Sequence, residues 1–454
     1  MAGRTLHLNV NILNAGFYSS AWRMPSSDPS AFAAVDHYVR IAQIAERGTF
    51  DAVFLADVPA FSDRPEYRSF QALEPTIVLA RVAAATDRIG LIGTASTTYN
   101  DPYNLARRFA SLDIASGGRV GWNIVTTADP SASRNFGFDD VTAHATRYAR
   151  AGEFAEVVKA LWDSWEDDAL VGDKATGRFI DTSKVHAIDH KGPFFDVKGP
   201  LNVPRSVQGR PVLVQAGGSR DGQALAARHA EAIFSVAHTL EEALAFATAI
   251  RTEARACGRS GDDIVILPGL GTIIGSTQAE ARRREEELWS LMPGDYGLRR
   301  VAGLLKVDPA SLDLDGPLPG TALPTDGMQT FFQALVGAAQ RDGLTVRQLI
   351  RKFGGSTGHR VIVGTPEQVA DDIEAWFRAG AADGFNLMPD VLPEGLEVFV
   401  DHVVPLLRRR GLFRHGYTGR TLREHFGLDR PESRYAQSRY APASAASSRV
   451  ASGA

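Results

Sequence analysis

The chain has 454 residues, 44% of them hydrophobic, and its 49 lysines and arginines against 53 acidic residues leave a formal net charge of -4. This near balance argues against nucleic acid or an anionic membrane surface as a partner. The single cysteine, Cys257, excludes an internal disulfide framework and a cysteine-ligated metal cluster. Because the N-terminus lacks a signal-peptide core and no apolar run approaches a bilayer span of about 18 to 20 residues, we expect a soluble cytoplasmic protein.

Eight short apolar strands alternate with amphipathic helices along the chain. The predicted strands begin near residues 6, 51, 89, 119, 211, 231, 264 and 384, and the clearest helices cover residues 32–47, 75–85, 143–165, 240–256 and 366–379. Eight successive βα units predict a closed (β/α)8 barrel, the TIM barrel of the α/β class. The alternative is a doubly wound open sheet, which usually has fewer strands and a glycine fingerprint near its start that this chain lacks.

The chain is longer than the roughly 250 residues that such a barrel needs. Two segments, about 166–209 and about 291–360, hold much of the excess, and both are rich in glycine and proline. Long βα connections gather over the C-terminal mouth of a barrel, so both insertions are predicted to lie there as lids that exclude water. We expect residues 1–432 to form one barrel domain and the Ser- and Ala-rich residues 433–454 to be a disordered tail.

The segment SGGRVGWNIVTT, residues 116–127, runs from a helix end into a buried strand. Asn123 interrupts the apolar pattern of this strand. A buried amide costs about 1 to 3 kcal/mol unless it is hydrogen bonded, so Asn123 needs a partner. That partner is either another protein group or a bound ligand.

Polar residues at the C-terminal ends of barrel strands are candidates for a site, because active sites of this fold are built there. Asp57 shares one strand face with Val53 and Leu55, and it either lines the mouth or caps the next turn. Thr94 and Ser96 end the third strand, where their hydroxyls either contact a ligand or complete a turn.

Two further features predict a phosphorylated ligand at the same mouth. His144 and Tyr148 lie four residues apart near the start of a long helix, on one face close to its positive end. The sequence AGGS, ending at Ser219, precedes another helix and offers backbone N–H groups to an anion. No metal is predicted, since His186 and His190 lie in a loop without further ligands at suitable spacing.

Several motifs together resemble one family. They are SGGRVGWNIVTT, RNFG at 134–137, RYARAGEF, KALWDSWEDDAL, HKGPFFDVKGPLNVPRSVQGRPVLVQAGGS and GAADGF. Over about residues 6–428, their order and spacing resemble the nitrilotriacetate and dibenzothiophene-sulfone monooxygenase branch of the bacterial-luciferase-like flavin-dependent monooxygenases. The resemblance implies a TIM barrel, reduced FMN as cosubstrate, dioxygen, a separate NAD(P)H-dependent flavin reductase and a homo-oligomer.

By matching motif, the resemblance implies flavin contacts at Asp57, Thr94, His144, Tyr148 and Ser219, with Asn123 as a secondary contact. His144, Tyr148 and Ser219 would hold the FMN phosphate. The implied reaction oxygenates a small organic compound at sulfur, nitrogen or carbon through a flavin C(4a) hydroperoxide. A deazaflavin-dependent oxidoreductase of the same barrel superfamily and a flavin-binding protein without turnover remain alternatives.

The chain departs from the family pattern at Met24. Family members often have a histidine after the sequence Ala-Trp-Arg, whereas here Met24 follows Arg23. The substrate and any catalytic base are therefore not assigned by the resemblance. His359, in the sequence GHR of the second insertion, is the one weak catalytic candidate, because it could reach the mouth from the lid.

Overall fold

Eight parallel strands close into a barrel in the computed structural model, which describes residues 4–61, 66–70, 72–319, 329–355 and 358–435. Neighbouring strands follow the order β10-β9-β4-β3-β2-β1-β13-β11, and pairing of β10 with β11 closes the ring. The strands are β1 (His7–Asn11), β2 (Ala52–Leu55), β3 (Gly90–Ser96), β4 (Val120–Val125), β9 (Val212–Gln215), β10 (Ala232–Ser235), β11 (Val265–Ile274) and β13 (Gly384–Pro389). The predicted barrel and its eight strands are confirmed, and the closed ring rules out an open sheet.

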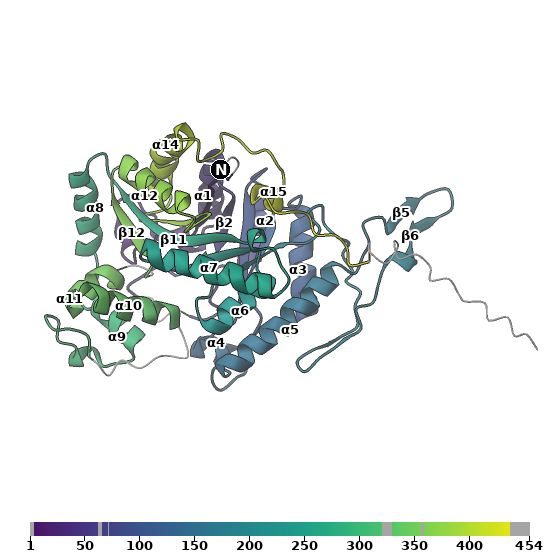
Figure 1. Ribbon diagram of the computed structural model, residues 1–454, viewed down its shortest axis with the longest axis horizontal. Coiled ribbons are helices and arrows are strands. Elements are labelled where there is room, and N and C mark those ends of the chain that lie inside the picture. Colours follow the sequence, from purple (N-terminus) through teal and green to yellow (C-terminus); the bar gives the residue numbers. More distant parts are fainter. Residues whose placement is uncertain (1–3, 62–65, 71, 320–328, 356–357, 436–454) are drawn as a thin grey trace, which may run out of the picture.

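Helices surround the barrel and return the chain from each strand to the next (Figure 1). They are α1 (Val35–Arg47), α2 (Pro75–Ala83), α3 (Pro102–Ala115), α5 (His144–Trp162), α6 (Arg220–His229), α7 (Leu240–Ala256), α12 (Pro366–Arg378), α13 (Glu394–Val398) and α14 (Val404–Arg409). Side-chain caps fix where several begin. In α12, Pro366 follows Thr365, whose hydroxyl accepts from the Gln368 backbone N–H in a capping box.

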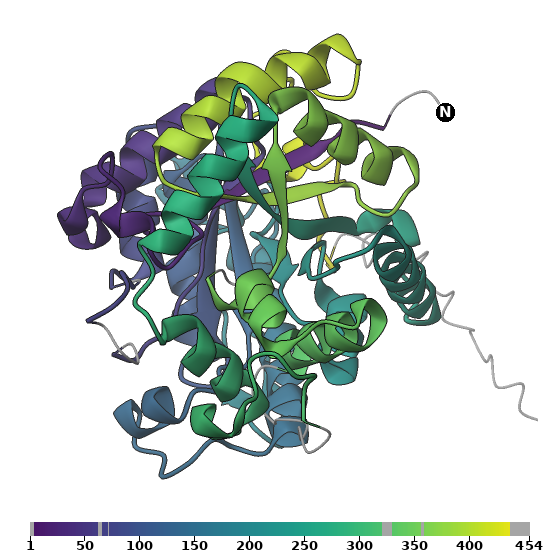
Figure 2. The same ribbon diagram turned by 90° about the vertical axis from the view of Figure 1, so that its left-hand side faces the viewer.

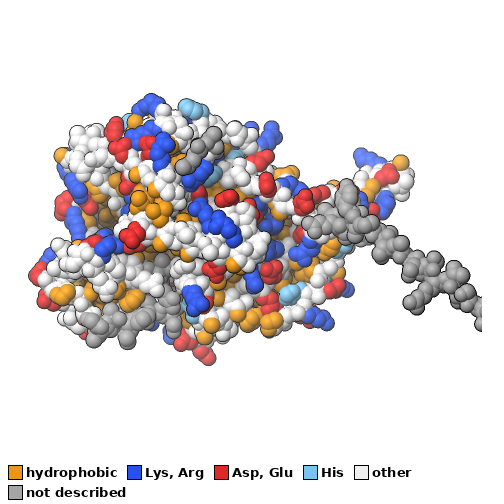
Figure 3. All heavy atoms as spheres, viewed as in Figure 1, with side chains coloured by type: hydrophobic (Ala, Val, Ile, Leu, Met, Phe, Trp, Pro, Cys, Tyr) orange, Lys and Arg blue, Asp and Glu red, His pale blue; other side chains and the backbone are white. Residues whose placement is uncertain are grey.

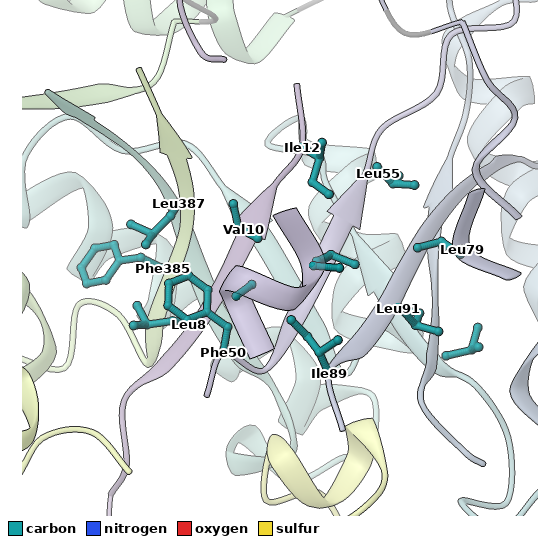
Figure 4. Packing of buried hydrophobic residues seen from close by; sticks show 14 of the residues in the cluster. Leu8, Val10, Ile12, Phe50, Leu55, Leu79, Ile89, Leu91, Phe385 and Leu387 are labelled. Atoms are coloured by element: carbon teal, nitrogen blue, oxygen red, sulfur yellow. The ribbon is translucent and has the colours of Figure 1, made fainter. Parts of the chain in front are cut away.

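The main hydrophobic core lies between the strands and the helices. Alternate residues on β1 and β13, such as Leu8, Val10, Phe385 and Leu387, pack with Leu79 of α2 in one continuous cluster (Figure 4). All five side chains are fully buried. Each contributes about 1.5 to 3 kcal/mol by leaving water, so this layer provides most of the rigidity on which the barrel mouth is built.

A short C-terminal helix, α15 (Leu422–His425), closes the opposite end of the barrel. Leu422 and Phe426 pack with Ala52 and other interior residues at the strand N-termini. Gly90 makes room for them, since a Cβ atom there would lie 2.5 Å from Leu422 Cδ1 and 2.7 Å from the Asp51 carbonyl oxygen. This end is therefore filled by side chains, and it leaves the C-terminal mouth as the place for a ligand.

The first insertion is not over the mouth, so the prediction for residues 166–209 is wrong. It connects α5 to β9, and an αβ connection starts at the end of the barrel opposite the mouth. Gln208 Nε2 donates to the carbonyl oxygen of Val120, the first residue of β4, at 2.9 Å, and Phe195 packs edge-on against Phe154 of α5. The insertion forms two hairpins, β5 (Leu170–Asp173) with β6 (Arg178–Ile180) and β7 (His190–Lys191) with β8 (Asp196–Val197). Figures 1 and 3 show the β5–β6 hairpin projecting away from the barrel.

The second insertion does lie at the mouth, as predicted, because it belongs to the connection from β11 to α12. After α8 (Gln278–Ser290) it folds into α9 (Tyr296–Leu305), α10 (Gln329–Asp342), α11 (Val346–Leu349) and a π-helical turn (Ile350–Gly354). Figure 2 shows these helices, in green, grouped together beside the barrel. They pack around their own apolar cluster, which includes Leu335, Leu349 and Phe353. The sequence did not predict these helices.

A ninth strand, β12 (Arg360–Gly364), ends this insertion and was not predicted. It pairs in parallel with residues 270–274 of β11, beyond the part of β11 that pairs with β10. β11 is long enough, at ten residues, to serve both partners.

Of the predicted tail, residues 433–435 belong to the described part of the chain and residues 436–454 lie outside it. Tyr435 stacks on His186 with 3.7 Å between ring centroids, so these first residues pack against the first insertion. Among the helices of the described residues, none has the length and apolar character of a membrane span.

Candidate active site

One cavity of ≈ 550 Å³ at the C-terminal ends of the strands collects the residues that the sequence singled out for the site, except Ser96. The Ser96 hydroxyl instead accepts from the Thr98 backbone N–H and the Thr127 hydroxyl. The cavity lining includes Asp57, Thr94, Asn123, His144, Tyr148, Ser219 and His359. They come from the β2–α2 loop, β3, β4, α5, the start of α6 and the segment before β12. Residues up to 302 positions apart in the sequence thus share one cavity, while their contacts with a ligand remain predictions.

The anion-binding end is built from two helix starts. Ser219 is the N-cap of α6, and its hydroxyl accepts from the Gly222 backbone N–H at 3.2 Å. Tyr148 Oη lies 3.5 Å from Ser219 Oγ. A Cβ atom on Gly222 would sit 3.2 Å from Tyr148 Oη, so glycine allows this close approach. Two hydroxyls and the free N–H groups of α6 therefore face the same point, as an oxyanion requires.

His144 is held over this end by an acid. It is the first residue of α5, and its Nδ1 lies 2.9 Å from Asp221 Oδ2 on α6. Its ring packs against Tyr148 with 4.7 Å between centroids. Asp221 thereby fixes the ring orientation and leaves Nε2 for a ligand. The positive end of the α5 dipole adds to the attraction for an anion.

Arg147 also lines the cavity, and the sequence analysis missed it. It lies between the two predicted phosphate contacts on α5, is 4% exposed, and donates to the Thr142 carbonyl oxygen. An arginine is always protonated, so it brings a fixed positive charge to the anion-binding end. The sequence HATRYAR contains a signal for Arg147: it lies three residues after His144, and residues three apart share a helix face, so it could have been predicted as a third contact of the anion.

The floor of the cavity carries an amide that is only half satisfied. Asn123 and Thr94 are register partners on β4 and β3, and Asn123 Nδ2 donates to Thr94 Oγ1 at 2.8 Å. Asn123 Oδ1 is buried without a hydrogen-bond partner, as is Oε1 of Gln215, another lining residue. The amide predicted to need a partner therefore has one protein partner and one acceptor left for a ligand.

Asp57 is mostly buried at the edge of the same cavity. Burial raises the pKa of its carboxyl to about 6, the charge of Glu74 adds to this effect, and Arg108 opposes it. A carboxyl with this pKa exchanges its proton near neutral pH, as general acids and bases do. Asp57 is thus suited to bind a cofactor N–H or hydroxyl group, or to accept a proton from one.

His359 forms an aromatic wall with two phenylalanines. It stacks on Phe234 with 5.0 Å between centroids and meets Phe331 edge-on at 5.4 Å. Its Nδ1 has no hydrogen-bond partner, and burial, together with the nearby His238, lowers its pKa to about 3. His359 therefore reaches the mouth as predicted, and it stands there as a neutral imidazole.

Met24 is 5% exposed and packs in an apolar cluster with Phe17, Tyr18 and Ala21. The cavity lining does not include it. No group of three or more His, Cys, Asp or Glu residues that could hold a metal ion occurs within the described ranges. His186 and His190, four apart in the sequence, instead pair with Glu166 and Glu153.

The cavity fits the expected FMN. Arg147, His144 and the hydroxyls of Tyr148 and Ser219 can hold a phosphate, and His359 gives the same cavity an aromatic wall with Phe234 and Phe331. The lining also includes the unpartnered side-chain oxygens of Asn123 and Gln215, which can accept from the N–H and hydroxyl groups of a flavin. A deep apolar pocket with a few placed polar groups is typical of cofactor sites.

Comparison with known proteins extends over nearly the whole chain. The luciferase-like monooxygenase family model matches residues 17–383. N-acetyl-S-(2-succino)cysteine monooxygenase of Bacillus subtilis (strain 168) is 44% identical, covering 96% of this chain and 99% of its own. Nitrilotriacetate monooxygenase component A of Aminobacter aminovorans is 43% identical, and the match again covers 96% of this chain and 99% of the relative. Dibenzothiophene-sulfone monooxygenase of Rhodococcus erythropolis (strain XP) is 41% identical, and the match covers 94% of this chain and 98% of the relative.

A solved structure agrees with these sequences. Riboflavin lyase, crystallised with modified FMN and riboflavin, superposes with a TM-score of 0.85 at 36% identity, covering 95% of this chain and 98% of that one. The predicted resemblance to the nitrilotriacetate and dibenzothiophene-sulfone monooxygenases is confirmed.

Proposed function

This chain belongs to the luciferase-like monooxygenase family, and we propose that it is the oxygenase of a two-component system that uses reduced FMN and dioxygen to oxygenate a small organic compound. The convergence of the predicted flavin contacts on one cavity carries the proposal. A relative named as component A of its monooxygenase supports a second component. For this chain the second component is a separate NAD(P)H-dependent flavin reductase.

The FMN phosphate lies among His144, Arg147, Tyr148 and Ser219 in this proposal. Charge-assisted hydrogen bonds from His144 and Arg147 supply most of the affinity, and the α6 N-terminus adds its dipole. The ring system lies toward Thr94, Asn123 and the aromatic wall, with Asp57 at its edge.

Bound reduced FMN supplies the electrons with which dioxygen is activated and one of its oxygen atoms is transferred to the substrate. The chain itself must hold reactants in place and keep water away. The aromatic wall and the second insertion keep water away, because both cover the mouth.

The relatives are named for three chemically different compounds, which contain sulfur or nitrogen, so the proposal covers oxidation at sulfur, nitrogen or carbon. The three named compounds of these relatives form the first test panel. A homo-oligomer is a further part of the proposal, and light scattering of the purified chain measures its mass.

The test supplies reduced FMN to the purified chain and follows dioxygen uptake and products by mass spectrometry. The chain alone should not oxidise NADH. With an unrelated flavin reductase, FMN and NADH it should convert a panel compound to an oxygenated product, which the same mixture without the chain should not form. Rapid NADH oxidation by the chain alone would contradict the two-component assignment. Tighter binding of a deazaflavin than of reduced FMN would favour the oxidoreductase alternative, and tight FMN binding without product across the panel would favour a binding protein.

A further inference from the structure

Arg300, on α9, is a partly buried arginine with which no carboxylate pairs among the described residues. Arg119 and Arg259 also lack a carboxylate partner, but both donate to backbone carbonyl oxygens. Arg423 pairs with Glu231 at 2.8 Å and Arg360 pairs with Asp372 at 2.6 Å. The Nε atom of Arg300, in contrast, is buried without a hydrogen-bond partner. A charge removed from water without a counter-ion costs several kcal/mol, so a negative group that binds beside Arg300 would relieve this cost.

The neighbours of Arg300 are groups that favour an anion. Tyr296 lies one helical turn earlier, on the same face of α9, and its Oη is 3.0 Å from Ser19 Oγ. Burial holds the pKa of Arg300 below its ordinary value. Tyr296, which also hydrogen-bonds the guanidinium, opposes this effect, and the nearby positive charge of Arg68 adds to it. Arginine nevertheless stays protonated. Two positive charges and two hydroxyls therefore meet here.

The place is the rim of the barrel mouth. Ser19, Arg68 and Arg300 belong to the connections that follow β1, β2 and β11, and each of these leaves the C-terminal end of its strand. Two of the same connections supply Val58 and Phe331 to the cavity lining. An acid group bound at Arg300 would thus belong to a molecule that enters beside the proposed flavin.

We propose that Arg300, beside Arg68 and with the hydroxyls of Tyr296 and Ser19, binds an anionic group of the substrate, a carboxylate or a sulfonate, at the rim of the cavity. The inference rests on the proposed monooxygenase function and names its substrate class, an organic acid. A guanidinium offers parallel N–H donors that match two oxygens of such a group. The rest of the molecule then extends toward the aromatic wall of His359, where oxygen transfer takes place.

The test measures binding directly, by calorimetry under anaerobic conditions with reduced FMN at saturation so that the phosphate site is filled. The probes are propane-1,2,3-tricarboxylate, ethane-1,2-disulfonate and the neutral trimethyl ester of the former. At least one of the two anions should bind saturably, and the ester should not. Arg300→Gln should weaken anion binding about 10- to 100-fold, the range for losing a charge-assisted hydrogen bond pair. Arg300→Lys should keep part of the affinity, because it keeps the charge.

Arg299→Gln is the matched control, since Arg299 is the neighbour on α9 but is exposed and pairs with Asp295. It should leave anion binding unchanged. Reduced-FMN affinity, measured separately, should be equal in all four proteins. Absence of saturable binding of both anions, or equal affinity in wild type and Arg300→Gln, would overturn the inference. Failure of reduced FMN to bind would instead overturn the proposed function, and the two failures are seen in separate titrations.

Discussion

Asn123 on β4 donates a hydrogen bond of 2.8 Å from its side-chain amide to the hydroxyl of Thr94 on β3, while its own carbonyl oxygen stays buried without a partner. The pair crosses two register-matched strands at the floor of the cavity. In the proposed site the same amide also accepts from the flavin, so the pair would couple the stability of the barrel interior to flavin binding.

Thr94→Val should lower the free energy of unfolding by about 1 to 3 kcal/mol, since it leaves the Asn123 amide N–H groups buried and unpaired. Urea denaturation measures the change. A second replacement, Asn123→Leu, removes the other partner, so the double variant should lose less than the sum of the two single losses. Strict additivity would show that the hydrogen bond does not contribute.

His144→Ala and Ser219→Ala should each weaken reduced-FMN binding by about 1 to 3 kcal/mol, because each removes a hydrogen bond to the phosphate. Anaerobic fluorescence titration measures the affinity. His190→Ala is the control: it also breaks a histidine contact to α5, through Glu153, but at a distance from the cavity lining. Unchanged affinity in both site variants would refute the phosphate assignment.

Most of the cavity residues could be predicted from the sequence, because a parallel barrel places the C-terminal ends of all its strands at one end. Asp57, Thr94 and Asn123 therefore had to converge once the eight strands were recognised. His144 and Ser219 followed from helix starts, whose N–H groups attract anions wherever they occur.

The sequence failed where the chain's path or a long-range contact decides. Residues 166–209 follow a helix, and recognising only their composition put them at the wrong end of the barrel. That no described carboxylate pairs with Arg300 depends on how α9 meets the loops after β1 and β2, which no local pattern encodes. For the same reason the register of β12 could not be predicted.

Gly90→Ala should destabilise the barrel by about 1 to 3 kcal/mol, because its Cβ would overlap the Asp51 carbonyl oxygen and the Leu422 side chain. Gly152→Ala is the opposite case. Gly152 lies inside α5 with nothing within 4 Å of the added Cβ, so alanine there should stabilise by up to about 1 kcal/mol. Thermal and urea unfolding compare both with wild type. If Gly90→Ala proved neutral, α15 would not pack tightly inside the barrel end.

Asp57→Asn should remove a pH dependence of stability. The pKa of Asp57 is about 6 in the folded protein and 3.8 in an ordinary environment, so between these values the folded state holds a proton that the unfolded chain has lost. Asp57 therefore makes stability fall as pH rises from about 4 to 6. Relative to wild type, the free energy of unfolding of the variant should rise by about 2 kcal/mol across this window. This figure takes about 1.4 kcal/mol per pKa unit and is reduced because Asp57 is partly exposed. Urea titrations at several pH values measure the difference, and a constant difference would contradict the burial effect.

His359 should act without titrating. With a pKa of about 3 it is neutral throughout the range in which the enzyme can be assayed, so its role is to stack on Phe234 and to offer one ring nitrogen to the reactants. His359→Gln keeps a hydrogen-bonding group, whereas His359→Phe keeps only the stacking. Dioxygen uptake with reduced FMN, followed from about pH 6 to 9, should change in amplitude but keep the inflections of wild type in both variants. Loss of an inflection in both would mean that His359 carries a proton in this range, which its burial and the nearby His238 oppose.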